Sequence, residues 1–179
     1  YARCAREQGR KVTIVGTDKD LMQLVNDDVR LYDPIKNKYL GANDVFEKFG
    51  VQPDKVVDVQ ALSGDSVDNV PGVPGIGIKT AAQLITEYGD LETLLAKAGD
   101  IKQPKRREAL IENADKARLS KRLVQLDAHA PVPMKIEYLK AHEPDKAQLV
   151  EFLKNYGFKT LLNRMGESQA AASVQSVKK

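Results

Sequence analysis

Four aspartates form two closely spaced pairs, and paired carboxylates of this kind are suited to holding divalent cations. One residue separates Asp18 from Asp20, and two residues separate Asp65 from Asp68. Mg²⁺ takes oxygen ligands and is usually held by few carboxylates together with water and substrate phosphates. Two such ions about 4 Å apart can stabilise both the attacking and the leaving oxygen of a phosphodiester. A fold that brought the two pairs together would therefore place a catalytic metal site for phosphodiester hydrolysis there.

A glycine-rich segment follows the second pair directly and has the composition of a phosphate-binding turn. Gly75 and Gly77 permit backbone conformations with positive φ, and without a Cβ they allow a bulky anion to come close. The residues from Lys79 onward predict a helix, whose first N–H groups would face that anion. Because the glycines lie between two helical patterns and not after a strand, they indicate a helix-hairpin-helix and not a dinucleotide fold. An ordinary glycine turn between packed helices is the alternative.

The elements that would position the first pair have the pattern of an open α/β sheet. Residues 12–15 are apolar and mostly β-branched, which predicts a buried parallel strand. Asp18 and Asp20 come just after its carboxyl end, where functional groups of such sheets collect. For Asp18 the role of a helix N-cap is an equally good interpretation, since a carboxylate before a first helical turn is stabilising.

The rest of the chain predicts two more strands and a series of helices. A helical segment that opens at Pro53 ends at Gly64 and so delivers the second pair of aspartates at its exit. Strands are expected at residues 29–32 and 39–40. The other expected helices span residues 1–8, 41–50, 79–88, 91–95, 106–125 as one long helix, and 145–165.

The composition is that of a folded domain. Because the net charge is small, only the local distribution of charge indicates a binding partner. The chain has 179 residues, 42% of them hydrophobic, and a net charge of only +3. Residues 97–122 carry nine Lys or Arg against four Asp or Glu, a candidate surface for nucleic acid. A solvated helix face is the alternative for this basic segment.

Several classes of protein are disfavoured. With Cys4 as the one cysteine, an intrachain disulfide framework and a cysteine zinc cluster are excluded, and a cytoplasmic location is expected. No run approaches the roughly 18 apolar residues of a membrane span, so no membrane partner is expected. Nothing in the sequence requires more than a monomer.

Two segments carry a resemblance to a known family. Residues 16–24 (GTDKDLMQL) and 62–81 (LSGDSVDNVPGVPGIGIKTA) resemble the 5′-nuclease domain of bacterial DNA polymerase I, within the wider flap-endonuclease family. The similarity extends from about residue 1 to about residue 165. It implies an α/β class and the C-terminal part of a PIN-like 5′-nuclease fold, with a helix-three-turn-helix motif that holds duplex DNA.

The resemblance also implies roles for particular residues. Those that match metal ligands, and hence the catalytic site, are Asp18, Asp20, Asp65 and Asp68. Those that match the DNA-binding hairpin and the helix start after it are Gly72, Gly75, Ile76, Gly77, Lys79 and Thr80. The implied cofactors are two Mg²⁺ or Mn²⁺ ions in the intact domain and a K⁺ ion at the hairpin carbonyls.

The implied reaction is metal-dependent hydrolysis at 5′ ends and flaps of DNA, including nicked duplexes and RNA primer strands, in replication and repair. A non-catalytic helix-hairpin-helix module that binds DNA is the alternative. It would use the same hairpin and the basic segment, but it gains nothing from concentrating acids beside its anion site. A small α/β domain with a capping Asp18 and a packing turn leaves the two aspartate pairs unexplained.

The family places further acidic ligands, including a Glu-Ala-Asp-Asp cluster, and a basic helical arch ahead of the position of Tyr1. We therefore expect this chain to be part of a longer protein, and to bind DNA weakly and cleave poorly, if at all, alone. Three parts are predicted: residues 1–40 as a remnant of the α/β core, 41–165 as the helical region, and 166–179 as a linker to a polymerase domain.

Overall fold

The computed structural model describes residues 1–166 and divides the chain into two compact units. The first unit is Tyr1–Ile136, and the second begins at Glu137. None of the helices in the described residues is both long and apolar enough to span a membrane. The predicted division at residues 40 and 165 stays a prediction, and the predicted linker, apart from Gly166, lies outside the described residues.

A three-stranded sheet forms one end of the first unit. Its strands are β1 (Val12–Val15), β2 (Val29–Asp33) and β3 (Lys38–Leu40), in that order across the sheet, and helix α1 (Ala2–Glu7) precedes them. Strands β1 and β2 run parallel and β2 and β3 antiparallel, which makes the sheet mixed. The prediction that the first strand is fully buried is wrong: it alternates, and Val15 is 66% exposed. Only one face of this strand packs on the core, through Ile14.

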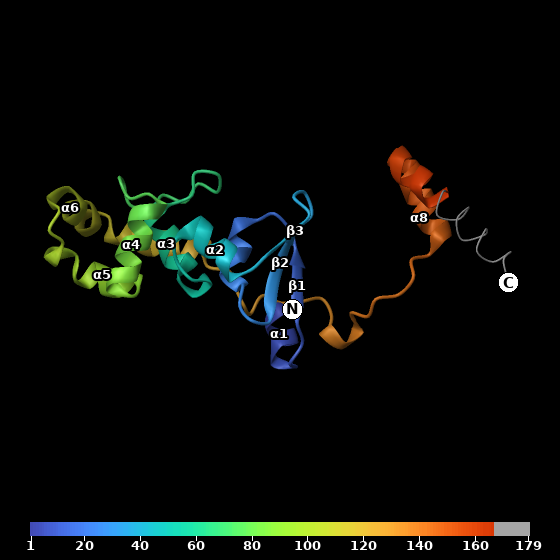
Figure 1. Ribbon diagram of the computed structural model, residues 1–179, viewed down its shortest axis with the longest axis horizontal. Coiled ribbons are helices and arrows are strands. Elements are labelled where there is room, and N and C mark those ends of the chain that lie inside the picture. Colours follow the sequence, from blue (N-terminus) through green and yellow to red (C-terminus); the bar gives the residue numbers. More distant parts are fainter. Residues whose placement is uncertain (167–179) are drawn as a thin grey trace. The chain divides into compact units, whose positions relative to one another are not determined.

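Helix α3 (Val56–Ser63) is the centre of the first unit. Four of its apolar residues, Val56, Val59, Ala61 and Leu62, have no exposed surface, so most of the helix is covered. It follows the short 3₁₀ helix η2 (Pro53–Lys55), and helix α2 (Ala42–Phe49) precedes both. Figure 1 shows α2 and α3 between the sheet and the remaining helices of this unit.

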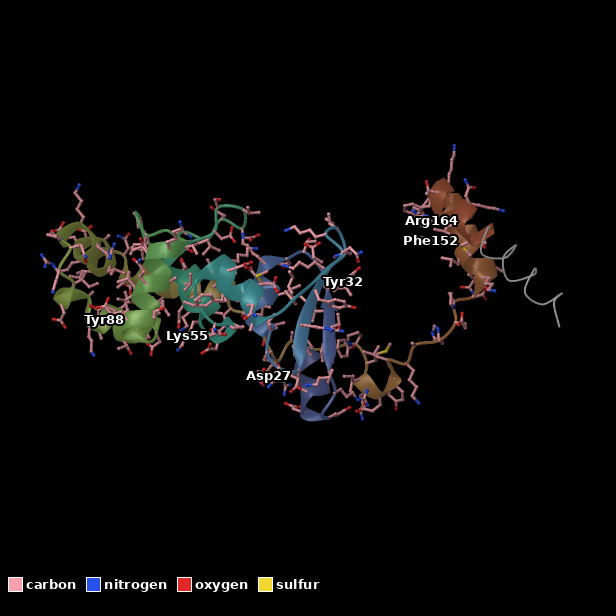
Figure 2. All side chains as sticks on the ribbon, in the orientation of Figure 1. Asp27, Tyr32, Lys55, Tyr88, Phe152 and Arg164 are labelled. Atoms are coloured by element: carbon pink, nitrogen blue, oxygen red, sulfur yellow. The ribbon has the colours of Figure 1, made fainter. Side chains whose placement is uncertain are left out.

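The remaining helices of the first unit follow the hairpin. They are α4 (Ile78–Tyr88), α5 (Leu91–Ala96), the 3₁₀ helix η3 (Ala98–Asp100), α6 (Pro104–Glu112) and α7 (Ala114–Val124). Helices α4 and α7 both pack against α3. In Figure 2 the labelled Lys55 and Tyr88 lie on this helical part, and Tyr32 lies on the sheet.

The predicted single helix over residues 106–125 is wrong, because the chain breaks at Asn113. The Asn113 side-chain amide donates a hydrogen bond of 2.9 Å to the carbonyl of Ala109. Side chains of this kind compete with the helix backbone for its carbonyls. The backbone of Asn113 leaves the helical region, with φ −113° and ψ 21°, so α6 ends there and α7 starts anew.

The described part of the second unit contains two α-helical stretches and an aromatic cluster. Helix α8 (Lys146–Asn155) begins at Asp145, whose carboxylate accepts from the N–H groups of Ala147 and Gln148, and the 3₁₀ helix η4 (Ile136–Tyr138) comes earlier in the chain. The predicted helix over residues 145–165 is interrupted at Gly157, where φ is +71°, and residues 159–166 are helical again. The ring centroids of Phe152 and Tyr156 lie 4.6 Å apart.

Candidate functional site

The first aspartate pair lies at the start of the 3₁₀ helix η1 (Lys19–Leu24), just after strand β1. Asp18 is the N-cap residue, and its Oδ1 accepts a hydrogen bond of 2.9 Å from the backbone N–H of Asp20. The capping interpretation of Asp18 is therefore confirmed. A capping carboxylate is still exposed to solvent here, and its second oxygen has no hydrogen-bond donor among the described residues.

The second carboxylate of this pair is fixed by a residue to which sequence analysis gave no role. Gln60, in the middle of α3, is 2% exposed, and its Nε2 donates a hydrogen bond of 2.5 Å to Oδ1 of Asp20. The amide oxygen of Gln60, Oε1, is buried and has no hydrogen-bond partner in the described part of the chain. A glutamine among the apolar residues Val59, Ala61 and Leu62 was the signal in the sequence that could have identified it.

The second aspartate pair lies in a tight turn that leaves α3. The N–H of Asp65 donates to the Val70 carbonyl at 2.9 Å, and the N–H of Val70 donates to the Asp65 carbonyl at 2.7 Å. Within this turn the N–H of Val67 donates to Oδ1 of Asp65 at 3.0 Å. Asp65 is 7% exposed, whereas the side chain of Asp68 is 55% exposed.

Lys19 connects the two pairs. It lies between Asp18 and Asp20 in the sequence, and its ammonium forms an ion pair with Oδ2 of Asp65. The same ammonium lies 3.9 Å from Oδ2 of Asp68. The turn after α3 and the loop after β1 therefore meet at one cation, which the chain itself supplies.

The electrostatics of the two carboxylates follow from this arrangement. Burial favours the protonated form of Asp65, but the hydrogen bond from Lys19 and the N–H of Val67 outweigh it, so the pKa of Asp65 is lowered. Partial burial and the neighbouring charge of Asp65 raise the pKa of Asp68, and Asp20 adds to this effect. The hydrogen bond to Asp65 raises the pKa of Lys19.

These contacts bring three of the four predicted ligands into electrostatic range of one another: Asp20, Asp65 and Asp68. Within residues 1–166, however, no three acidic, histidine or cysteine side chains are placed to share a single metal ion. The ammonium of Lys19 interacts with the carboxylates of both Asp65 and Asp68. A set of hard oxygen donors that already shares one cation has the chemistry that a hard divalent ion requires.

The predicted hairpin is held against the end of α3. Gly72 has φ +61°, and a Cβ there would lie 2.4 Å from the backbone nitrogen of Gly64. The N–H of Gly72 donates a hydrogen bond of 2.9 Å to Oγ of Ser120, on α7. The next N–H, of Val73, donates to the carbonyl of Leu62 at 2.7 Å. Packing inside the protein therefore requires glycine at position 72.

The tip of the hairpin is open. Gly75 has φ +78°, and a Cβ at Gly75 or Gly77 would meet no atom within 4 Å. Gly77 is the N-cap of α4, whose first turn contains no acidic residue. Ile76 is only 4% exposed and its N–H donates to the carbonyl of Val73, so the exposed backbone of the tip is that of Gly75 and Gly77. Lys79 is exposed and Thr80 is half-buried in the first turn of α4.

Part of the basic segment lies beside this tip. Lys105 and Arg106, in the first turn of α6, line a hollow of about 550 Å³ together with Pro74, Gly75 and Ile76. Neither cation forms an ion pair with another described residue. The hairpin and the start of α6, about 30 residues apart in the sequence, thus line one hollow, to which Lys105 and Arg106 give positive charge.

Other bases of the segment serve the fold. Arg118 donates to both carboxylate oxygens of Glu92, at 3.0 and 3.1 Å, and so ties α7 to α5. Lys121 lies 2.7 Å from Oδ1 of Asp58, a residue of α3 that is 6% exposed. Arg118 and Lys121 of α7 therefore form ion pairs that support the fold, whereas Lys105 and Arg106 of α6 form none with the described residues.

Comparison with known sequences decides the family. Residues 51–147, more than half of the chain, match the family described as 5′-3′ exonuclease, C-terminal SAM fold. The chain belongs to this family. The matched residues include the second aspartate pair, the hairpin and the basic segment, and the predicted family is confirmed.

The similarity extends to whole proteins. The chain is 53% identical over 168 residues to DNA polymerase I of Rhizobium leguminosarum and 35% identical over 171 residues to a 5′-3′ exonuclease of Aquifex aeolicus. These alignments cover 94% and 96% of this chain, and 16% and 58% of the relatives. The chain therefore spans less than two thirds of either relative.

A solved structure supports the fold. The flap endonuclease of bacteriophage T5, determined with DNA and metal ions, matches with a TM-score of 0.62 and 23% identity, over 69% of this chain and 47% of that protein. The predicted C-terminal part of a 5′-nuclease fold is confirmed by this match and by the family.

Proposed function

We propose that this exonuclease-family chain is the part of a 5′-nuclease that holds duplex DNA by its backbone and contributes carboxylates for metal-dependent hydrolysis of a phosphodiester at 5′ ends and flaps. One observation carries the proposal. The carboxylate turn and the hairpin are both fastened to the last turn of α3, since Asp65 directly follows that turn and the N–H of Val73 bonds to Leu62. A strand bound at the hairpin would lie within reach of the carboxylates.

The hairpin supplies the DNA contact through its backbone. Its tip has no side chains at positions 75 and 77, and α4 directs free N–H groups outward from Gly77. A phosphate fits such a helix start, and Lys79, Lys105 and Arg106 add positive charge around it. A K⁺ ion held by hairpin carbonyls would strengthen the same contact. The T5 relative, which was determined with DNA, supports a DNA partner.

The carboxylates fit divalent cations, which we propose to be Mg²⁺ or Mn²⁺. The candidate ligands are Asp18, Asp20, Asp65 and Asp68, all oxygen donors, and the T5 structure contains metal ions. Bound there, such ions would neutralise the phosphate and lower the pKa of a water molecule that attacks it. The chain's own contribution is to orient Asp20 through Gln60 and Asp65 through the N–H of Val67.

The substrates we propose are nicked duplexes and 5′ flaps, including RNA primer strands, and the longer polymerase relatives support a polymerase domain linked to this one. A non-catalytic DNA-binding module remains the second candidate for the chain alone. One observation favours it. In the described residues the carboxylates are joined by Lys19, and no three potential ligands are placed to share a metal ion.

Cleavage of a 5′-labelled flap DNA in Mg²⁺ tests the proposal. The protein should be assayed as this chain and with the family's acidic upstream segment joined to Tyr1. We expect the extended protein to cut near the flap junction and Asp68→Asn to reduce its rate by at least about 100-fold. An extended protein that binds the flap tightly and never cuts would establish the binding module instead.

A further inference from the structure

Lys19 brings a positive charge to the carboxylates of the acidic site. Its ammonium contacts Oδ2 of Asp65 and lies 3.9 Å from Oδ2 of Asp68. The Lys19 side chain is 29% exposed and that of Asp65 is 5% exposed, so this ion pair is shielded from water on one side. It is unlike the exposed pair of Lys11 and Asp28, whose side chains are 76% and 42% exposed.

A shielded carboxylate requires a cation. Removing the partner of a buried charge is strongly unfavourable, because the remaining charge has neither water nor a counter-ion. Asp65 therefore needs either the ammonium of Lys19 or another cation at the same oxygen. The ammonium of Lys19 lies on Oδ2 of Asp65 and 3.9 Å from Oδ2 of Asp68, so a divalent ion that binds these same oxygens must displace it.

We propose that Lys19 is the internal counter-cation of Asp65 and Asp68, and that it competes with the divalent ion for their oxygens. This inference rests on the proposed function, because it takes these carboxylates as metal ligands. Lys19 then sets the metal concentration at which the site loads, and it neutralises the shielded carboxylate of Asp65 when no metal is bound.

The surrounding contacts allow this exchange without rebuilding the site. The Val67 N–H and the two backbone hydrogen bonds between Asp65 and Val70 hold the turn independently of Lys19. Asp20, on the other side of Lys19, is fixed by Gln60. The lysine has a long flexible stem with an exposed flank, so the charged head can swing to solvent with its proton retained.

The test is a Mn²⁺ titration followed by electron paramagnetic resonance of the free ion, with the full 179-residue chain. Lys19→Met removes the competing charge, and we expect it to bind Mn²⁺ about tenfold more tightly than wild type. Without metal the variant should melt at a lower temperature, and Mn²⁺ should raise its melting temperature more than it raises that of wild type. Lys11→Met, which removes an exposed pair, should change neither quantity.

Two further variants keep the outcomes distinct. If Lys19→Met does not fold without metal, Lys19→Gln retains a neutral donor to Asp65 and should show the same gain in affinity. Asp68→Asn should weaken Mn²⁺ binding in either background. If Asp68→Asn weakens binding but neither Lys19 variant tightens it, the competition is refuted and the metal site stands. If Asp68→Asn has no effect, the proposed metal site itself fails, and this inference fails with it.

Discussion

The hydroxyl of Ser120 accepts a hydrogen bond of 2.9 Å from the backbone N–H of Gly72, across 48 residues of sequence. Ser120 has no exposed surface, and Gly72 is buried as well. The bond joins helix α7 to the base of the hairpin. The hairpin that we propose to bind DNA is therefore held in place by a helix that follows it much later in the chain.

Replacing Ser120 by alanine should cost stability and loosen the hairpin. Ser120→Ala leaves the buried N–H of Gly72 without an acceptor, for which we expect a loss of about 1–3 kcal/mol in the free energy of unfolding. Urea denaturation measures it. Ser63→Ala, which removes a partly buried hydroxyl that donates to the adjacent Gly64 carbonyl, should cost less. Equal losses in the two variants would show that the bond to Gly72 has no special role.

The glycines of the hairpin should separate folding from binding. Gly72→Ala places a Cβ 2.4 Å from a backbone nitrogen at a φ of +61°, so it should destabilise the protein by at least about 3 kcal/mol. Gly77→Ala meets no protein atom and has φ −90°, so the fold should tolerate it. If a phosphate approaches Gly77 closely, Gly77→Ala should nevertheless weaken binding of a nicked duplex in a fluorescence anisotropy titration. Unchanged affinity would remove the hairpin tip from the DNA contact.

Two arginines of the basic segment should differ in their effect on DNA binding. Arg106→Gln removes a charge beside the hairpin that has no ion-pair partner in the described residues. The slope of log affinity against log salt concentration should therefore fall in magnitude by about 1, the value for one phosphate contact. Arg118→Gln breaks the pair with Glu92 and should leave the salt dependence unchanged. Affinity measured across a series of KCl concentrations gives both slopes. A smaller slope for Arg118→Gln alone would place the DNA on α7 instead.

Acid should destabilise the protein partly through Asp44. The ammonium of Lys38, 2.5 Å away, and the N–H of Gly41 hold the pKa of Asp44 below its ordinary value of 3.8. A carboxyl with a lowered pKa contributes stability above its unfolded value, and that contribution is lost as the pH falls through the folded value. Thermal melts below about pH 5 should therefore show a smaller loss in Asp44→Asn than in wild type. Asp54→Asn, at an exposed carboxylate, is the control, and it should follow the wild-type curve.

Elements with local signals were predictable from the sequence. Strands β2 and β3, helix α2 and the end of α3 at Gly64 lie where turn residues and apolar periodicity place them. The break at Asn113 was missed, because the apolar spacing continues through it while the Asn113 side chain bonds to the backbone of Ala109. The exposure of Val15 was missed because an apolar strand has the same sequence pattern whether one face or both are covered.

The aspartates of the candidate site were predictable from the sequence, but the residues that hold them in place, Gln60 and Lys19, were not. The aspartate pairs and the hairpin have characteristic spacing, so they stood out as a motif. Gln60 contacts Asp20 across 40 residues, and Lys19 contacts Asp65 across a similar distance in the chain. Contacts between residues so far apart in the sequence depend on how η1 packs against the end of α3, and no local sequence pattern predicts that packing. The assignment of the four aspartates as metal ligands stays a prediction.

The most direct test of the central claim is a crystal structure of the chain, extended upstream as above, with a 5′-flap DNA and Mn²⁺, solved with the anomalous signal of manganese. The account predicts anomalous peaks in coordination contact with Asp65 or Asp68 and a DNA phosphate against the N–H groups of Gly75 or Gly77. DNA bound elsewhere, or manganese absent from these carboxylates while DNA occupies the hairpin, would contradict it.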